Sequence, residues 1–318
     1  MKNFALLGLA GYVAPRHLKA IKETGNNLSA ALDKQDNVGI VDSYFPAADF
    51  FTEAERFERH IYKIQHAIHG VPIDYFSICT PNYLHDAHIR MALRNNADAI
   101  CEKPLVLNPW NAEALSELEK ETGKKIYTIL QLRHHPAVVA LKNKIDADKS
   151  AKIHDVDLTY ITGRGKWYHY SWKGNDEKSG GLATNIGIHF FDMLYYLFGE
   201  VKTNTVHCRN SSWCAGFLQL ERARVRWFLS IDPAHLPDKS KQKGQMSYRS
   251  VLVDNQELEF TEGFADLHTV SYQQLLSGNG FGLDCAKPSI EIVHRIRNAD
   301  CLSAPTTDKH PFVRKIQP

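Results

Sequence analysis

The chain has little methionine, few cysteines and no marked excess of either charge. Its 318 residues include 4 Met and 6 Cys, and 38 Lys and Arg stand against 36 Asp and Glu. The formal net charge of +2 argues against nucleic acid as the general partner, while a local cationic pocket for an anionic ligand stays compatible with it. Every apolar run is shorter than the roughly 20 residues that span a bilayer, so we expect a soluble protein without a membrane partner.

The cysteines lack the spacing of a metal site or a disulfide framework. No CxxC pair occurs, and scattered thiols in a chain of this length are typical of reduced, cytoplasmic proteins. The segment Met1–Gly11 has the one Lys and the apolar run of a weak signal peptide. That run is short and is soon followed by Pro15, which favours a first β-strand. The cysteines are Cys79, Cys101, Cys208, Cys214, Cys285 and Cys301.

The first part of the chain alternates short apolar strands with helical patterns. The expected helices are Pro15–Thr24, a helix that opens at a Thr52 N-cap with Glu55 three residues on, His85–Asn95 and Asn108–Thr122. The expected strands are Phe4–Leu7, Asn27–Leu32, Tyr75–Cys79, Ala99–Cys101 and Ile126–Leu130. This alternation predicts an α/β domain with a parallel, doubly wound sheet over residues 1–130.

Residues 131–318 have a different texture, rich in strands with close spacing. Two helices, Leu182–Phe198 and Pro288–Asn298, interrupt them, and Pro233–Gly244 reads as a polar, Lys-rich loop. The expected strands are Lys152–Gly163, Val201–Cys208, Trp213–Glu221, Val225–Ile231, Arg249–Val253 and Leu258–Thr261. The pattern predicts an α+β domain with a mainly antiparallel sheet, and a C-terminal tail that returns to the first domain is compatible with it.

A glycine turn stands between the first expected strand and the first helix. The segment Gly8–Ala14 reads G-L-A-G-Y-V-A. Glycines there permit a tight turn and let backbone N–H groups approach a pyrophosphate at the N-terminus of the following helix. The pattern departs from GxGxxG, because one extra residue separates Gly8 from Gly11 and Ala14 replaces the third glycine.

Asp33 strengthens the case for a dinucleotide. It follows the expected strand Asn27–Leu32, about 20 residues beyond Gly11, where an acidic residue accepts hydrogen bonds from the ribose hydroxyls and repels a 2′-phosphate. This favours NAD over NADP, although the neighbouring Lys34 is compatible with NADP. The alternative interpretation is that Asp33 is an ordinary turn residue.

Two further segments carry candidate catalytic groups. Lys103 stands in the sequence C-E-K-P, at the carboxyl end of a strand, where open α/β sheets bind ligands. The segment Gly180–Asp192, G-G-L-A-T-N-I-G-I-H-F-F-D, places Asn185 and His189 one helical turn apart on the same face. A lone Lys is usually a surface residue and a His among apolar residues is usually in the core, but the combination indicates a site.

The glycine turn, the E-K-P turn and the GG-x3-N-x-G-x-H helix together resemble the Gfo/Idh/MocA oxidoreductases, over nearly the whole chain. The resemblance implies a Rossmann domain that binds NAD, followed by a domain with a large open-faced sheet that often mediates oligomers. It implies that Lys103 and His189 flank the carbon that gives up hydride. His189 is then the general base, and the Lys103 ammonium stabilises the developing alkoxide. Many members carry Asp where this chain has Asn185, which shifts more of the proton chemistry to Lys103. The implied cofactor-binding residues are Gly8, Gly11, Tyr12, Val13, Asp33, Thr80, Asn82, His85, Glu102, Lys103, Gln131, Trp167 and Tyr168.

Segments 8–17, 162–168, 171–174 and 183–187 are similar to one branch, the bacterial UDP-N-acetylglucosaminuronate 3-dehydrogenases. This implies oxidation of the sugar 3-hydroxyl in surface-polysaccharide (O-antigen) biosynthesis, and a homotetramer. In some members 2-oxoglutarate reoxidises the NADH. A UDP-sugar acid carries about three negative charges, which a site meets with Arg or Lys. The expected substrate-binding residues are Arg16, Arg164, Lys166, Lys173, Asn185 and His189, and Arg133 is a further cation of suitable type.

Two other functions stay open at this stage. An inositol or glucose dehydrogenase on the same scaffold would bind an uncharged polyol, against which the cations of segment 162–173 argue. A NAD-binding sensor would do no chemistry, and it would not need to keep both Lys103 and His189. The aromatic residues Trp167, Tyr168 and Trp172 either pack on the ligands or close a corner between sheet and helix.

Two minor features have alternative explanations as well. His134 and His135 are adjacent, so their side chains diverge, and we expect no metal site there. Ala286–Ile290 leads into the expected helix Pro288–Asn298, whose N-terminus either meets an anion or is capped by Ser289.

Overall fold

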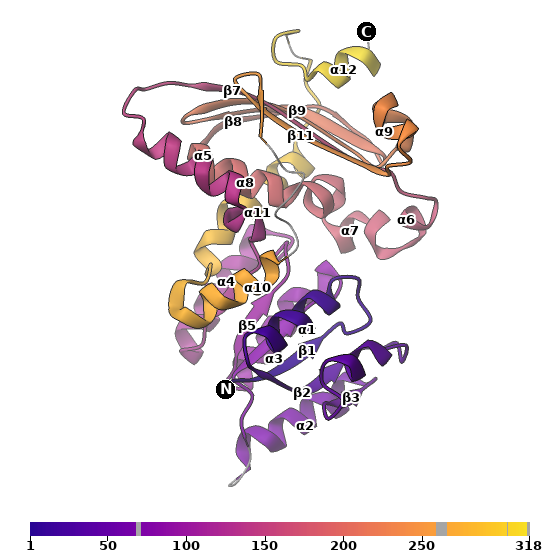
Figure 1. The fold of residues 1–318 in the computed structure, drawn as a ribbon, viewed down its shortest axis with the longest axis vertical. Helices are drawn as coiled ribbons and strands as arrows, with labels where there is room; N and C mark the ends of the chain where they lie inside the picture. Colours follow the sequence, from indigo (N-terminus) through magenta and orange to yellow (C-terminus); the bar gives the residue numbers. More distant parts are fainter. Residues whose placement is uncertain (68–70, 259–265, 304, 317–318) are drawn as a thin grey trace. The chain divides into compact units, whose positions relative to one another are not determined.

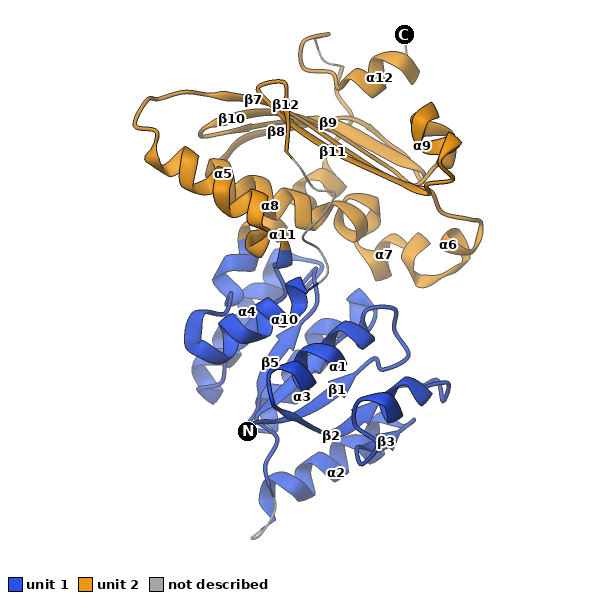
Figure 2. Ribbon diagram, viewed as in Figure 1, with its two compact units in different colours: residues 1–131, 266–287 blue, residues 132–265, 288–318 orange. Residues whose placement is uncertain are grey.

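The computed structural model describes residues 1–67, 71–258, 266–303 and 305–316. The chain forms two compact units, each with its own sheet (Figure 2). The first unit comprises Met1–Gln131 together with Asp266–Lys287, and the second comprises Leu132–Ala265 with Pro288–Pro318.

The first unit is built on a six-stranded, all-parallel sheet in the order β3-β2-β1-β4-β5-β6. Figure 1 labels β1, β2, β3 and β5 of this sheet. This order, with two halves on either side of β1, is that of the dinucleotide-binding fold. The predicted doubly wound parallel sheet is thereby confirmed. The strands are β1 Asn3–Leu7, β2 Asn27–Leu32, β3 Asp49–Phe51, β4 Tyr75–Ile78, β5 Asp98–Cys101 and β6 Ile126–Thr128.

Short apolar strands form this sheet because both of its faces are covered by helices, so most strand residues are buried, although none of the edge strand β3 is. All five residues of β1 are buried.

The helix α1 begins with Pro15 in its first turn, where the missing N–H costs nothing. The predicted N-cap of α2 at Thr52 is wrong: the cap residue is Glu53, and no side chain caps the helix. The helices are α1 Ala14–Glu23, α2 Ala54–His66, α3 His85–Arg94, α4 Pro109–Thr122 and α10 Leu267–Gln274.

Helix α10 comes from the late segment of the chain but belongs to the first unit. Lys19 Nζ donates to Asp266 Oδ1 at 2.6 Å, and Thr269 Oγ1 donates to Glu23 Oε2 at 2.8 Å. These contacts fasten α10 along α1. Further on, the Phe281 carbonyl accepts the Thr128 N–H at 2.9 Å, which adds an edge contact to β6.

The second unit contains a six-stranded mixed sheet in the order β12-β11-β7-β10-β9-β8. Only the β7–β10 pair is parallel within it, so the predicted, mainly antiparallel sheet is confirmed. Of the predicted strand Leu258–Thr261, residues 259–261 lie outside the described residues, and the last strand ends at Glu257. The strands are β7 His154–Thr162, β8 Val201–Arg209, β9 Trp213–Leu220, β10 Ala223–Ser230, β11 Ser247–Val253 and β12 Gln256–Glu257.

Strand β10 shows how this sheet is covered. Side chains alternate between its faces: Trp227 meets Phe191 of α8 edge to face, while Phe228 packs beside Phe312 of α12. Figure 1 accordingly shows α5 and α8 along one face of the sheet and α12 on the opposite side. The helices of this unit are α5 Pro136–Ala147, α6 Trp167–Tyr170, α7 Asp176–Ser179, α8 Ile188–Phe198, α9 Asp238–Gln242, α12 Pro311–Ile316 and most of α11 Leu283–Asn298.

Two predictions about this part of the chain are wrong. Helix α11 begins at Leu283 and has Pro288 inside it, so no helix N-terminus lies at Ser289 to meet an anion. The expected loop Pro233–Gly244 contains a 3₁₀ turn, Pro233–His235, and the helix α9. Among the described residues, no helix is both long and apolar enough to cross a membrane.

Candidate active site

The glycine turn between β1 and α1 needs both of its glycines. Gly8 has a φ of +90°, and a Cβ placed on it would lie 2.7 Å from backbone atoms of Cys79 and Thr80. A Cβ on Gly11 would lie 2.9 Å from the Gly8 carbonyl oxygen. The turn therefore runs directly against the end of β4, and a side chain at either position would push the two backbones apart.

The start of α1 offers backbone donors to a ligand. In the part of the chain that the structure describes, the N–H groups of Tyr12 and Val13 have no hydrogen-bond partner, whereas the Gly11 N–H bonds to Gly8. Free N–H groups at a helix N-terminus attract a phosphate. The residues of the turn thus fit the pyrophosphate of a dinucleotide. Tyr12 itself is exposed, and the Arg16 guanidinium lies 5.7 Å from the centre of its ring.

Asp33 lies next to this turn, directly after β2. Its Oδ2 accepts the Ala10 N–H and its Oδ1 accepts the Gln35 N–H, each at 2.9 Å. The backbone thus orients the carboxylate beside the glycine turn. This is the place that an acidic partner of the adenosine ribose occupies in dinucleotide-binding sheets.

The ends of β4 and β5 are linked by one buried ring, His85 at the start of α3. Its Nδ1 lies 2.7 Å from the Pro104 carbonyl oxygen and its Nε2 lies 2.8 Å from that of Thr80. Burial lowers the pKa of His85, against the opposing effect of these two carbonyls. Because both ring nitrogens face protein carbonyls, His85 connects the turn after β4 with the turn that carries Lys103.

The other residues expected at these strand ends are placed as follows. Thr80 Oγ1 lies 2.9 Å from His88 Nδ1, and Asn82 is buried. Lys103 is half-buried, and its backbone N–H donates to Glu102 Oε2 at 3.3 Å. Gln131, the last residue of the first stretch of this unit, opens a 3₁₀ turn after β6.

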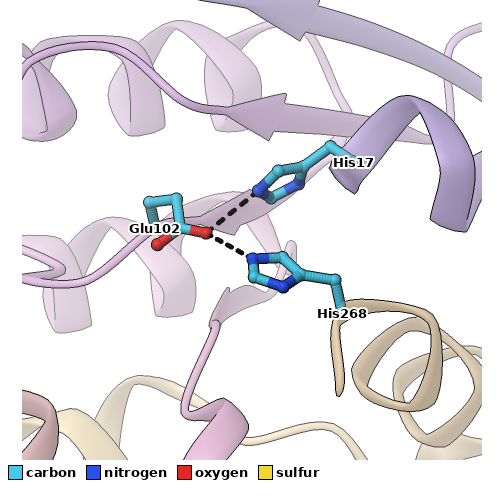
Figure 3. Close-up of side chains that lie close together, drawn as sticks. All are labelled: His17, Glu102 and His268. Carbon is cyan, nitrogen blue, oxygen red and sulfur yellow. Dashed lines mark hydrogen bonds and ion pairs between the residues drawn. The ribbon is translucent and has the colours of Figure 1, made fainter. Parts of the chain in front are cut away.

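Glu102 is the centre of a buried cluster that the sequence did not reveal (Figure 3). Its Oε1 lies 3.1 Å from His17 Nε2 and 2.8 Å from His268 Nε2. On the other side of His17, the Tyr272 hydroxyl lies 2.7 Å from Nδ1. Burial alone would raise the pKa of Glu102, but the hydrogen bonds from the two imidazoles outweigh it and hold that pKa well below its usual range. The carboxyl group is therefore ionised.

No local signal points to this cluster, because its members stand in three separate places of the sequence. Helix α1 supplies His17, the end of β5 supplies Glu102 and α10 supplies His268. Only the return of α10 to the first unit brings them together. The three ligand-type atoms lie within 4.8 Å of one another, which is also compatible with a metal ion.

In the second unit, the GG segment leads into an irregular helix. Gly180 and Gly181 have φ values of +82° and +81°, which glycine adopts without strain. Ala183–Gly187 forms a π-helical turn before α8, a feature frequent at functional sites. Asn185 lies in this turn, and its Nδ2 donates to the Tyr168 hydroxyl at 2.8 Å. Sequence reasoning missed this contact, since the two residues come from separate segments.

His189 lies on α8, one turn beyond Asn185 and half-buried. The Tyr160 ring of β7 stands 6.0 Å from its imidazole, edge to face. One turn further, Asp192 accepts two hydrogen bonds from the buried Arg133, at 3.0 and 2.6 Å. Arg133 is therefore engaged inside the second unit and is not exposed to meet an anion.

Of the expected substrate cations, Arg164, Lys166 and Lys173 belong to the second unit, whereas Arg16 lies on α1 of the first. Arg164 and Lys166 are exposed, and Lys173 lies over the rings of Trp167 and Trp172 at 5.2 and 5.6 Å. Burial, and after it the charge of Arg164, lower the pKa of Lys173. Tyr168 is buried while the neighbouring Trp167 is half exposed, so of these two residues only Trp167 presents its ring to solvent.

His135 caps α5 by accepting the Ala137 N–H at 3.2 Å.

Two family models match the chain, one for each unit. The model described as "Oxidoreductase family, NAD-binding Rossmann fold" matches residues 2–130, and "Oxidoreductase family, C-terminal alpha/beta domain" matches residues 142–237. The chain therefore belongs to the Gfo/Idh/MocA family of NAD-binding oxidoreductases. This confirms the resemblance that the motifs indicated, the expected cofactor and the expected class of enzyme.

Solved structures give a more particular likeness. The WlbA (WbpB) dehydrogenase from Thermus thermophilus, in complex with NAD and UDP-GlcNAcA, is 53% identical with a TM-score of 0.94, over 98% of this chain and 100% of that chain. A structure of the WlbA (WbpB) dehydrogenase from the same organism holds NAD and alpha-ketoglutarate, with the same identity, coverage and TM-score. The WlbA dehydrogenase from Bordetella pertussis, at 17% identity and a TM-score of 0.75, over 93% of this chain and 94% of that chain, shows the shared fold.

Curated relatives match less of their own length. Inositol 2-dehydrogenase from Rhizobium meliloti is 31% identical over 62% of this chain and 55% of its own. Glucose-6-phosphate 3-dehydrogenase from Bacillus subtilis is 24% identical over 62% and 54%. The chain thus spans about half the length of these two relatives.

Proposed function

We propose that the protein oxidises the 3-hydroxyl of UDP-N-acetylglucosaminuronic acid to the 3-keto sugar with NAD. The observation that carries this proposal is the likeness, over 98% of this chain and 100% of the other, to a dehydrogenase whose structure holds both ligands. The reaction removes a hydride from C3 and a proton from the 3-hydroxyl. NAD, when bound, accepts the hydride, and the protein takes the proton.

Each of the expected site residues has a separate role in this proposal. The N–H groups at the start of α1, in the turn of Gly8 and Gly11, hold the pyrophosphate, and Asp33 binds the adenosine ribose. The Lys103 ammonium donates a hydrogen bond to the sugar oxygen and stabilises its negative charge as the proton leaves. His189 accepts that proton.

Asn185 supports the second unit's part of the chemistry without a charge. Its amide binds the Tyr168 hydroxyl, whereas a carboxylate at this position would attract an imidazolium. An amide therefore stabilises a protonated His189 less than a carboxylate would, so Lys103 contributes more of the charge stabilisation. The substrate's uronate and diphosphate meet Arg16, Arg164, Lys166 and Lys173.

The likeness to a dehydrogenase with bound alpha-ketoglutarate supports a second half-reaction. In it, 2-oxoglutarate takes the hydride back from NADH together with a proton and becomes 2-hydroxyglutarate, which regenerates NAD. We further propose that the protein acts in the cytoplasm as a homotetramer, in the synthesis of sugars for bacterial surface polysaccharides.

A substrate panel tests the proposal against the polyol alternative, which the inositol 2-dehydrogenase relative favours. Purified protein with NAD is offered UDP-N-acetylglucosaminuronic acid, UDP-N-acetylglucosamine, UDP-glucuronic acid or myo-inositol, with and without 2-oxoglutarate, and NADH and 2-hydroxyglutarate are measured. The proposal expects turnover with the first compound above all. Preference for myo-inositol would support the alternative, and no reduction with any compound would favour a sensor.

A further inference from the structure

The buried cluster around Glu102 has a defined direction of hydrogen bonding. Since Glu102 is ionised, both imidazoles donate Nε2–H to its Oε1. Burial lowers the pKa of His17 despite the hydrogen bond to Glu102, so this ring is neutral and its Nδ1 is an acceptor. The Tyr272 hydroxyl, 2.7 Å away, therefore donates to His17 Nδ1, and it accepts from Ser77 Oγ at 2.6 Å.

This chain of donors ends at Glu102, which also accepts a hydrogen bond from the backbone of Lys103. The two imidazoles occupy Glu102 Oε1, and its other oxygen, Oε2, accepts the Lys103 N–H at 3.3 Å. On the far side of the turn, His85 Nδ1 lies 2.7 Å from the Pro104 carbonyl oxygen. The backbone around Lys103 is thus held from both sides by buried side chains, His17 being fully buried and His268 only 5% exposed.

We propose that His17 and His268 are positioning residues for Lys103, which act by fixing the ionised Glu102 behind the E-K-P turn. The inference rests on the proposed catalytic role of Lys103. It assigns a role to α10: the return of this late segment to the first unit delivers the imidazole without which Glu102 Oε1 keeps a single donor. Misplacement of a catalytic group by about 1 Å can cost roughly 10²-fold in rate.

The alternative explanation is a metal ion that binds Glu102 Oε1 and the Nε2 atoms of both histidines, in place of the two N–H protons. Separations of 2.8 and 3.1 Å between the imidazole nitrogens and one carboxylate oxygen are those of N–H···O bonds. A structural zinc site has four protein ligands, whereas the described residues supply three here. The geometry therefore favours hydrogen bonds.

The test compares His268→Leu, which removes the donor, with His268→Gln, whose amide places an N–H near the position of Nε2. Tyr272→Phe removes the donor to His17. His60→Leu, which replaces a partly buried histidine of the same unit on α2, is the matched control. Each variant is first checked for folding by thermal unfolding and for NAD binding by calorimetry, and its metal content is measured by mass spectrometry.

With sugar substrate, we expect His268→Leu to lower kcat by about tenfold or more while KM for NAD changes by less than about threefold. His268→Gln should restore most of the rate, Tyr272→Phe should lie between, and the control should match the wild type. Equal kcat for His268→Leu and the wild type would overturn the proposal, as would one equivalent of zinc in the wild type that His268→Leu loses. If His268→Leu does not fold, the comparison of His268→Gln and Tyr272→Phe with the control decides.

A second readout does not require turnover. The rate at which an amine-reactive acetylating reagent labels Lys103, followed by mass spectrometry against pH, reports the surroundings of its ammonium. The proposal expects a changed pH profile in His268→Leu and a nearly unchanged one in His268→Gln; identical profiles in all variants would contradict it. If the variants show this labelling pattern but the wild type oxidises no sugar, the proposed function is wrong and the positioning role of the two histidines still holds.

Discussion

Asp33 Oδ2 accepts the backbone N–H of Ala10 at 2.9 Å, so the acidic residue after β2 is fastened to the glycine turn after β1. The carboxylate is held in place by the backbone, which would lower the entropic cost of binding the proposed adenosine ribose. This hydrogen bond joins the two parts of the sequence motif, the glycine turn and the acidic residue. The spacing in the sequence suggested that Asp33 and the glycine turn bind the same ligand. The hydrogen bond shows that Asp33 and the turn are in direct contact.

Asp33→Ala should weaken NAD binding by roughly 10- to 100-fold, because a hydrogen bond to a charged group contributes about 1.5–3 kcal/mol. Binding of the UDP-sugar acid should change far less. Asp33→Asn keeps an oxygen acceptor for the Ala10 N–H and separates the loss of charge from damage to the turn. Calorimetric titration with each ligand measures both affinities, and an equal loss of the two would indicate misfolding instead.

Lys103→Ala should lower kcat by about 10²-fold or more, the size typical of a positioned acid–base group. NAD affinity should change far less than kcat, because the proposed pyrophosphate and ribose contacts lie elsewhere in the unit. Steady-state kinetics with varied NAD and varied sugar separate these effects. Near-normal turnover would remove Lys103 from the mechanism.

If Lys173 binds the anionic substrate as proposed, the affinity for that substrate should depend on pH. Burial lowers the pKa of its ammonium from the ordinary 10.5, and the nearby Arg164 lowers it further. The positive charge is present below that pKa and is lost as pH rises through it. KM for the UDP-sugar acid should therefore begin to rise at a lower pH than an ordinary lysine would cause.

Lys173→Arg should keep the charge and postpone this rise, since guanidinium stays protonated throughout. The comparison is a series of KM values between neutral and alkaline pH, with the exposed Lys178→Arg as the matched control. A wild type and a Lys173→Arg variant with the same alkaline profile would exclude Lys173 from substrate binding.

The ion pair of Arg133 and Asp192 should be needed for folding, independent of any ligand. Arg133→Met leaves a carboxylate buried without its partner and should lower the free energy of unfolding by about 3–5 kcal/mol. The double variant Arg133→Met, Asp192→Leu should recover much of that loss. Urea unfolding of these variants, beside Lys120→Met from an exposed pair, measures the difference; a single variant as stable as Lys120→Met would contradict the expectation.

The sequence predicted the fold well where strands are short, apolar and covered on both faces. Burial of both faces favours a continuous apolar run, and the expected strand Phe4–Leu7 lies within β1. The predicted boundaries of helices were wrong where tertiary contacts override the local sequence signals. Pro288 suggested a helix start, yet α11 begins a turn earlier, and α10 was missed because it has no strong apolar periodicity.

The candidate site divides in the same way. The glycine turn and the place of Asp33 after β2 could be predicted because both depend on backbone geometry within a single βαβ unit. The contact between Tyr168 and Asn185 and the cluster of His17, Glu102 and His268 could not be found, since their members come from separate segments. Arg133 was a plausible anion ligand from its type alone, and its partner Asp192 was visible only in the fold.

The most direct test of the account is a single turnover with UDP-N-acetylglucosaminuronic acid that carries deuterium at C3. Protein in excess over substrate is mixed with NAD without 2-oxoglutarate, and the nucleotide and the sugar are analysed by mass spectrometry. The account predicts that the deuterium moves from the sugar to the nicotinamide while the sugar becomes a ketone. Deuterium that stays in the sugar, with or without NADH formation, would contradict it.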